Sequence, residues 1–206
     1  MTPKDGIEEL LRPLQDTDEA AAELGRRFSE RAAREGDAEV AWATVDSPVG
    51  RTSIASTSAG IVAVGLPNRD LDDFVRELSE AISPRVVEAP ARLDVARREL
   101  SEYFEGERQG FDLELDWRLV PGGFYRKVLD ATARLPFGTV VTYGEIARKA
   151  GNARAHRAAG TALGANPLPI VVPCHRIVRA GGDPGNYGGG PKLKRWLLEL
   201  EGALST

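Results

Sequence analysis

Apolar and polar residues alternate along one early stretch of the chain, residues 39–66. Its sequence, EVAWATVDSPVGRTSIASTSAGIVAVGL, is rich in Val, Ile, Thr and Ser, with turn residues at 47–48 and 58–60. Alternation with a period of two, interrupted by turns, predicts a small antiparallel sheet. Residues 111–119, FDLELDWRL, alternate in the same way and predict a further strand.

Two other stretches of this half repeat apolar residues at helical spacing. Residues 93–106, LDVARRELSEYFEG, predict a helix that ends at Gly106. Residues 70–82, DLDDFVRELSEAI, predict an amphipathic helix. Its apolar face carries Leu71, Phe74, Val75, Leu78 and Ile82.

The first 38 residues predict one or two helices, because Ala, Glu, Leu and Arg dominate and apolar residues recur near helical spacing. Pro13 is expected to break the first helix and Gly36 to end the second. Since no residue here carries recognisable chemistry, we expect a packing or partner surface.

The pattern changes after residue 120. Residues 124–135, FYRKVLDATARL, predict a helix that ends before a Pro-Phe-Gly turn. In TYGEIARKAG, Thr142 and Glu145 stand at the spacing of a capping box. Asn152 is placed to cap the next helix, ARAHRAAGTALGA. Two short helices joined by a glycine-containing turn are typical of a helix-turn-helix, although many such pairs bind nothing.

The second of these helices consists mostly of small residues. Its only long polar side chains are Arg154, His156 and Arg157. Ala and Gly let a helix approach either a neighbouring helix or a narrow groove, into which an arginine can reach. Packing and groove binding both remain open for this helix.

The segment LPIVVPCHRIV predicts a buried strand that ends at Pro173, and it contains the single cysteine of the chain. A lone cysteine in an apolar run is usually a small hydrophobe. Here Pro173 fixes the backbone, and His175 and Arg176 are expected to place positive charge near the sulfur of Cys174. Such surroundings lower a thiol pKa and favour the reactive thiolate.

Two enzyme classes that use a cysteine and a histidine fit poorly. A cysteine protease needs a histidine ring against the sulfur, which an adjacent residue such as His175 rarely supplies, and His156 lies on the small-residue helix. A phosphatase loop has its histidine before the cysteine, whereas here Cys174 comes first.

Composition narrows the classes further. With 206 residues, 42% of them hydrophobic, the chain can bury a core in one large domain or two small ones. A single cysteine excludes an internal disulfide, and one cysteine with two histidines makes a zinc site of these residues implausible. With no apolar run near ~20 residues and no signal-like N-terminus, we expect a soluble cytoplasmic protein.

Charge is divided unevenly along the chain. Residues 121–206 hold 12 Lys and Arg against 5 Asp and Glu, a charge of +7, whereas residues 1–120 hold 15 against 26, a charge of −11. This asymmetry indicates either a basic working half on an acidic support or an unevenly charged surface.

The segment PCHRIV, followed by GNYGGGPKLKRWLLELEG, resembles the O6-alkylguanine-DNA alkyltransferase family, also called methylated-DNA–protein-cysteine methyltransferases. TYGEIARKAGN and HRAAGTALGANPLPIVVPCHR are similar to the same family in the same order. The similarity is continuous over about residues 124–202. Residues 39–118 resemble the family only in their strand-and-helix pattern, and residues 1–38 show no resemblance.

The resemblance implies an α+β fold. Residues 39–120 would form a ribonuclease H-like domain with a small sheet and helices, after a helical extension over residues 1–38. Residues 121–206 would form a mostly helical, winged-helix-like domain with the helix-turn-helix. This second domain would bind DNA and accept the alkyl group.

The resemblance also implies the chemistry, DNA repair by direct and irreversible transfer of an alkyl group from guanine O6 to Cys174, once per molecule. The base would first be flipped out of the duplex. His175 would act through a water as the base, and Glu201 would orient His175. Without the resemblance, Glu201 would be taken for an exposed carboxylate at a helix end.

Further residues of the implied site surround the flipped base. Tyr143 would reach guanine N3, Tyr187 would form an aromatic wall, and the backbone N–H of Gly188 would face O6. The carbonyls of Cys174 and Ile177 would accept from the exocyclic amine. Core tyrosines and ordinary turn backbone are the alternative explanation for these residues.

The implied DNA contacts lie mainly on the small-residue helix. Arg157 would fill the stack that the flipped guanine leaves, and Asn166 would form a hinge between this helix and the cysteine segment. The expected DNA-binding residues, in the minor groove of duplex DNA, are Thr142, Tyr143, Arg157, Ala158 and Gly160.

We expect no cofactor, no metal and a monomer. Some relatives hold zinc in the first domain through Cys and His, which this chain lacks there. Two rival functions remain. One is a non-catalytic binder of alkylated DNA, a branch of the family in which the acceptor cysteine is replaced. The other is a helix-turn-helix regulator with an inert buried cysteine.

Overall fold

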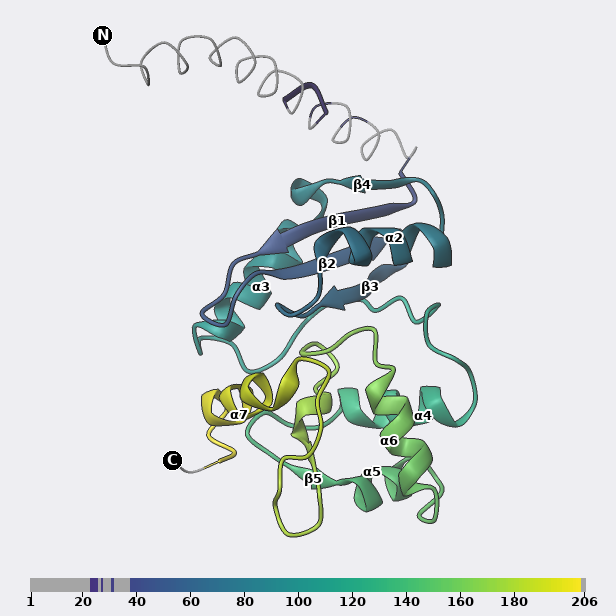
Figure 1. Cartoon of the computed structure of the whole chain (residues 1–206), viewed down its shortest axis with the longest axis vertical. Coiled ribbons are helices and arrows are strands. Elements are labelled where there is room, and N and C mark those ends of the chain that lie inside the picture. The colour runs from purple at the N-terminus through teal and green to yellow at the C-terminus, as the bar shows by residue number, and fades with distance from the viewer. Residues whose placement is uncertain (1–22, 26, 28–30, 32–37, 205–206) are drawn as a thin grey trace, which may run out of the picture.

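The computed structural model describes residues 23–25, 27, 31 and 38–204. Most of the predicted helical extension, including Pro13 and Gly36, lies outside the described residues; residues 23–25, 27 and 31 are helical. Figure 1 shows a sheet with its helices next to a mostly helical domain.

A four-stranded sheet forms the centre of the first domain. Strands β1 (Val40–Val45), β2 (Thr52–Thr57) and β3 (Gly60–Gly65) form an antiparallel meander, as the alternating pattern predicts. Strand β4 (Val86–Glu88) pairs in parallel with β1, so the order is β3-β2-β1-β4. The sequence did not predict β4, because three residues carry no alternation signal.

The two faces of the sheet pack against different elements. Helix α2 (Leu71–Ala81) covers one face, where Phe74 and Leu78 are buried against the strands, and the predicted amphipathic helix is confirmed (Figure 1). The 3₁₀ turn η1 (Pro90–Leu93) and helix α3 (Asp94–Phe104) belong to the core on the other face. That core continues without a break into the helical domain.

Residues 111–119 do not form the predicted strand. Only Leu115 pairs, through an isolated bridge to Ile61 of β3. The side chain of Asp116 then accepts a hydrogen bond from Thr57 of β2, which holds this point of the segment at the sheet, and another from the N–H of Arg118, which closes a local turn. The alternation in this segment therefore reflects half-buried side chains in a segment that connects the two domains, and it does not indicate a strand.

The second domain contains four helices and a short parallel sheet. They are α4 (Phe124–Ala133), α5 (Tyr143–Lys149), α6 (His156–Gly164) and α7 (Gly190–Leu200), with β5 (Val141–Thr142) paired to β6 (Ile177–Val178). Helix α6 packs against both α4 and α5. The fold is therefore α+β, as expected.

The helix-turn-helix is formed by α5 and α6. The capping box of Thr142 and Glu145 is present at the start of α5. Asn152 does not cap α6, because the helix begins at His156 and the Asn152 side chain instead accepts from the N–H of Arg154 within the turn.

The apolar segment before the cysteine is buried but is not the predicted strand. The N–H of Val172 donates to the carbonyl of Leu168 over 2.8 Å, which closes a turn. Ile170 lies in this turn with φ of 74°, the one positive value among the described non-glycine residues. Such a conformation costs about 1–3 kcal/mol. Two prolines in the segment lack N–H donors, so it cannot form a regular ladder.

Candidate active site

Cys174 begins a 3₁₀ turn, η2 (Cys174–Arg176), that leads into β6. It is 8% exposed, so the residue is nearly but not fully enclosed. Burial raises the pKa of the thiol, and the hydrogen bond from Asn166 and the charge of Lys194 oppose this only in part. The expectation that its sequence neighbours lower this pKa is therefore wrong.

The reason is the direction of the two neighbouring side chains. The guanidinium of Arg176 forms two hydrogen bonds to the carboxylate of Glu201, each 2.8 Å long, and another to the carbonyl of Leu135. His175 is held neutral, because burial lowers its pKa. Neither residue thus supplies free positive charge to the sulfur.

Glu201 is the acceptor for a group of buried side chains. His175 Nε2 lies 2.9 Å from Glu201 Oε1, and the hydroxyl of Tyr103 donates to the same oxygen over 2.6 Å. Burial alone would raise the pKa of Glu201, but hydrogen bonds from His175, Arg176 and Tyr103 lower it to about 2. Glu201 is therefore a buried carboxylate, and the explanation as an exposed helix-end charge is wrong.

The imidazole of His175 has one nitrogen available for chemistry. Since Nε2 faces an ionised carboxylate, this nitrogen carries the ring proton and donates a hydrogen bond to Glu201. Nδ1 is buried and has no hydrogen-bond partner among the described residues. A neutral imidazole with an unpartnered Nδ1 can accept a proton at that atom.

Asn166 joins the end of α6 to the cysteine turn. Its Nδ2 donates to the carbonyl of Val172 over 2.9 Å and to the sulfur of Cys174 over 3.2 Å. Its Oδ1 accepts from the N–H of Leu168 over 3.0 Å. One side chain thus fixes both ends of the turn that precedes the cysteine.

Two tyrosines of the predicted base pocket are placed differently. Tyr143, the first residue of α5, is half-buried, and its ring faces the backbone of Gly160 on α6. The hydroxyl of Tyr187 is buried with no partner among the described residues, and its ring stands edge-on to His175 at 6.3 Å. Burial raises the pKa of both phenols.

The backbone groups of the predicted pocket already have some partners. The carbonyl of Cys174 accepts from the N–H of Ile177, and the carbonyl of Ile177 accepts from the ammonium of Lys194 over 2.5 Å. At Gly188 the predicted group is the N–H, whereas the carbonyl of this residue accepts from the side chain of Asn68 over 3.0 Å. Each carbonyl has a second lone pair, so a further donor can still bind.

Sequence reasoning missed two residues of this site, Tyr103 and Lys194. Tyr103 lies on α3, in the sheet domain, 72 residues before His175. Lys194 is a fully buried lysine of α7, and burial lowers its pKa to about 8. The signal for Lys194 was its place in line with buried leucines of α7, Leu193 and Leu197, where a charge is out of place.

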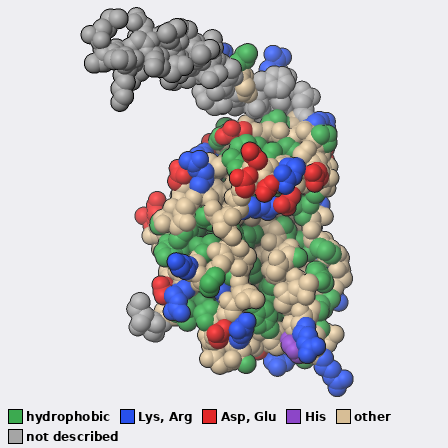
Figure 2. Space-filling model, in the orientation of Figure 1, with side chains coloured by type: hydrophobic (Ala, Val, Ile, Leu, Met, Phe, Trp, Pro, Cys, Tyr) green, Lys and Arg blue, Asp and Glu red, His purple; other side chains and the backbone are tan. Residues whose placement is uncertain are grey.

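The first turn of α6 and the turn that leads into it carry exposed basic side chains. Arg154, His156 and Arg157 are exposed, whereas Ala159 and Ala162 are buried against the neighbouring helices. The small residues thus pack on one side, while Ala158 and Gly160 are only half-buried. Figure 2 shows Lys and Arg around the exposed histidine at this end, while most Asp and Glu in view lie on the sheet domain.

Two further observations on the described residues concern metal ions and membranes. No group of three or more His, Cys, Asp and Glu side chains within residues 38–204 is arranged to hold a metal ion. Within the same part of the chain, no helix has the length and apolar content needed to cross a membrane.

The fold and the site define a DNA-binding helix-turn-helix domain that carries a cysteine beside a histidine–glutamate pair, supported by a sheet domain. Two family models match: the ribonuclease-like domain of 6-O-methylguanine DNA methyltransferase over residues 40–117, and its DNA binding domain over residues 123–203. The chain belongs to the methylated-DNA–protein-cysteine methyltransferase family.

Relatives and solved structures agree with this assignment. The chain is 38% identical over 162 residues to the methylated-DNA–protein-cysteine methyltransferase of Mycolicibacterium paratuberculosis, covering 79% of this chain and 92% of that protein. The enzyme of the same name from Methanosarcina acetivorans is 36% identical, with 79% and 98% covered. The Mycobacterium tuberculosis O6-methylguanine methyltransferase structure has a TM-score of 0.68 at 35% identity, covering 81% and 95%. The same enzyme in complex with DNA has a TM-score of 0.67 at 37% identity, covering 79% and 92%.

Proposed function

We propose that this protein repairs DNA by moving an alkyl group from O6 of guanine to the sulfur of Cys174, once per molecule. The observation that carries the proposal is that Asn166, two residues after the end of α6, donates a hydrogen bond from its side chain to the sulfur of Cys174. It couples a DNA-binding helix directly to a nucleophile. Family membership and the relatives' activity support the same reaction.

The proton of Cys174 leaves through His175. Because burial disfavours the thiolate, a base must remove this proton as the alkyl group arrives. Nδ1 of His175 takes it through one water molecule, and Glu201 stabilises the imidazolium from the other side of the ring. The S–C bond then forms as the C–O6 bond breaks, and guanine leaves with the electron pair. The thioether has no easy route back, so the protein is consumed.

Groups around the base stabilise the leaving guanine. Tyr143 donates a proton or hydrogen bond to N3, and the N–H of Gly188 faces O6. The carbonyls of Cys174 and Ile177 use their second lone pairs for the exocyclic amine. The ring of Tyr187 forms an aromatic wall of the pocket that receives the base. Such donors act on charge that develops in the transition state, where they have the greatest effect.

Duplex DNA is the partner, approached through its minor groove by α6. Exposed Arg157 enters the stack in place of the flipped guanine, while half-buried Ala158 and Gly160 allow a close approach. Thr142 and Tyr143 at the start of α5 contact the DNA backbone next to the flipped base. The protein acts as a monomer in the cytoplasm, with a DNA-binding and acceptor domain over residues 121–206, a supporting domain over 39–120 and an extension over 1–38.

Intact-protein mass spectrometry tests the reaction. After incubation with duplex DNA that contains O6-methylguanine, one added methyl group should map to Cys174. Binding to damaged DNA without a mass change would instead identify a non-catalytic binder. No preference for damaged DNA would identify a regulator with an inert cysteine.

A further inference from the structure

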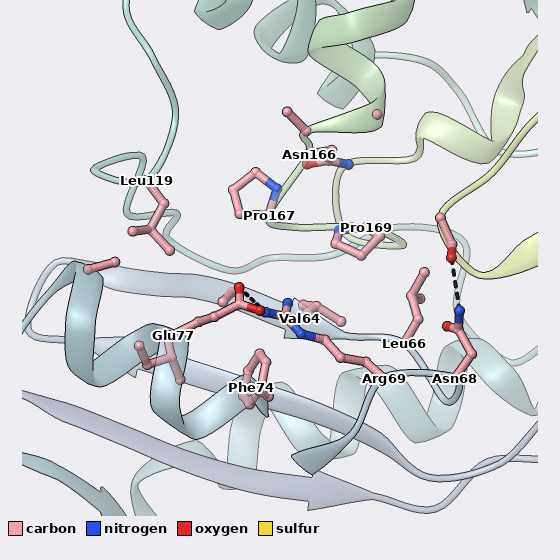
Figure 3. Close-up of a pocket in the computed structure, with 16 residues that line it drawn as sticks. Val64, Leu66, Asn68, Arg69, Phe74, Glu77, Leu119, Asn166, Pro167 and Pro169 are labelled. Carbon is pink, nitrogen blue, oxygen red and sulfur yellow. Dashed lines mark hydrogen bonds and ion pairs between the residues drawn. The ribbon is translucent and has the colours of Figure 1, made fainter. Parts of the chain in front are cut away.

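The loop between β3 and α2 reaches across from the sheet domain to the glycine-rich loop before α7. In this loop, the side-chain amide of Asn68 donates to the carbonyl of Gly188 over 3.0 Å, a bond between residues 120 positions apart. Figure 3 shows this bond at one side of a cavity between the two domains. A residue of the supporting domain therefore contacts the proposed O6-binding residue.

A second residue of the same loop packs on the same glycines. The Cδ1 atom of Leu66 lies 3.9 Å from the position that a Cβ would take at Gly188, and 3.0 Å from that position at Gly189. Leu66 is buried, so this contact is shielded from solvent. The glycine loop is thus held by an apolar contact as well as by a hydrogen bond.

The sheet domain also holds the segment after α6. The N–H of Val64 in β3 donates to the carbonyl of Pro167 over 2.8 Å, next to Asn166. Between this bond and the bond of Asn68 lies a cavity of about 600 Å³, lined in part by Leu66, Asn166 and Gly188 (Figure 3). The two bonds therefore fix both sides of a space that side chains do not fill.

Three consecutive glycines, residues 188–190, make this support necessary. Glycine has the greatest backbone freedom, and these residues offer no side chain to pack on their own domain. A donor that must meet a developing charge has to be held in place before the reaction. One hydrogen bond within the loop, from the N–H of Gly190 to the carbonyl of Tyr187 over 2.9 Å, contributes to this, and the contacts of Asn68 and Leu66 add support from the sheet domain.

We propose that Asn68, backed by Leu66, is a positioning residue for alkyl transfer. By fixing the carbonyl of Gly188, it orients the glycine loop so that the Gly188 N–H faces guanine O6. The proposal rests on the proposed function, because it assigns a role in that reaction to the sheet domain. Loss of one such hydrogen bond should slow transfer by roughly three- to tenfold.

The test compares Asn68→Asp and Asn68→Ala with the unchanged protein and a control. Aspartate has the same shape but cannot donate to a carbonyl. The control, Arg85→Ala, removes an exposed ion pair with Glu39 elsewhere on the sheet domain. Three quantities are measured for each protein: the single-turnover transfer rate at saturating O6-methylguanine duplex, the duplex Kd, and the rate with free O6-benzylguanine.

Each Asn68 variant should slow transfer from duplex DNA and reaction with O6-benzylguanine, and the factor should be the same for the two substrates. The duplex Kd and the thermal midpoint should not change. Arg85→Ala should change none of these quantities. A merely structural role predicts a lowered thermal midpoint with the rate loss, and that result would overturn the proposal. Unchanged transfer rates would also overturn it. Failure of the unchanged protein to transfer would refute the proposed function itself, which is a separate outcome.

Discussion

The side-chain amide of Asn166 donates a hydrogen bond to the sulfur of Cys174 over 3.2 Å. The same residue binds the backbone of Leu168 and Val172, so it also sets the path of the chain into the cysteine turn. A donor on sulfur favours the thiolate over the thiol. The residue that follows α6 thus affects both the position and the ionisation of Cys174.

Asn166→Asp should raise the thiol pKa, because aspartate cannot donate to sulfur and brings a negative charge beside it. The rate of reaction with O6-benzylguanine at pH 7 should fall by about tenfold, since one pKa unit of the nucleophile corresponds to that factor. A pH–rate profile measures the shift. Asn152→Asp, in the turn before α6, is the matched control and should keep the original profile. An unaltered profile for Asn166→Asp would contradict the role of this bond.

Acid should unfold the protein because of Glu201 and His175. Glu201 has its folded pKa depressed from 4.5 to about 2, so its contribution is present above pH 4.5 and is lost as the pH falls towards 2. The full contribution is roughly 3 kcal/mol. The pKa of His175 is also lowered, so its contribution is present above pH 6.5 and is lost below it. Urea unfolding from pH 7 to pH 3 measures the fall in the free energy of unfolding.

The variant Glu201→Gln tests how much the carboxylate of Glu201 contributes to stability. It leaves the buried guanidinium of Arg176 without its charge partner, so the free energy of unfolding at pH 7 should fall by about 3 kcal/mol. Between pH 4.5 and pH 3 the variant should show a flatter dependence than the unchanged protein. Parallel curves would place the acid-sensitive group elsewhere.

Cys174→Ala should abolish transfer and leave DNA binding intact, because the cysteine is a buried residue of the turn η2 and is not one of the exposed residues of α6. A gel shift with O6-methylguanine duplex, run beside a transfer assay, measures both properties. Residual transfer in this variant would show that another atom accepts the alkyl group.

Arg157→Ala should impair transfer from duplex DNA more than reaction with the free base. Flipping costs a few kcal/mol, which an inserted side chain offsets only when a duplex is present. We expect a loss of at least about tenfold with duplex and under about twofold with O6-benzylguanine. Arg154→Ala, on the turn that leads into the same helix, is the control. Equal losses of rate with both substrates would contradict the proposal that Arg157 is inserted into the base stack.

Gly60→Ala should destabilise the sheet domain by about 2 kcal/mol or more. Gly60 has φ of 132°, and a Cβ there would collide with the carbonyl of Glu114 in the connecting segment. Gly164→Ala, where a Cβ meets nothing within 4 Å, should instead change the thermal midpoint little or raise it. Comparable midpoints for the two variants would contradict this packing.

Local patterns predicted the elements whose partners are close in sequence. The meander of β1, β2 and β3 follows from alternation between turns, and the capping box of Thr142 and Glu145 lies within one helical turn. The resemblance then indicated that His175 and Glu201 act together. The patterns failed in residues 111–119 and 168–173, because alternation and apolar runs record burial and do not specify a hydrogen-bonding partner.

The sequence by itself therefore predicted most of the elements, indicated the family and pointed to Cys174 as the candidate nucleophile. Only the tertiary structure decided that the pKa of Cys174 is raised, because burial raises it and because Arg176, its neighbour in sequence, pairs with Glu201, 25 residues later. It also brought Tyr103, 98 residues before Glu201, into the same buried group. Burial and long-range hydrogen bonds set the energy of a charge, and neither is encoded in the residues beside it.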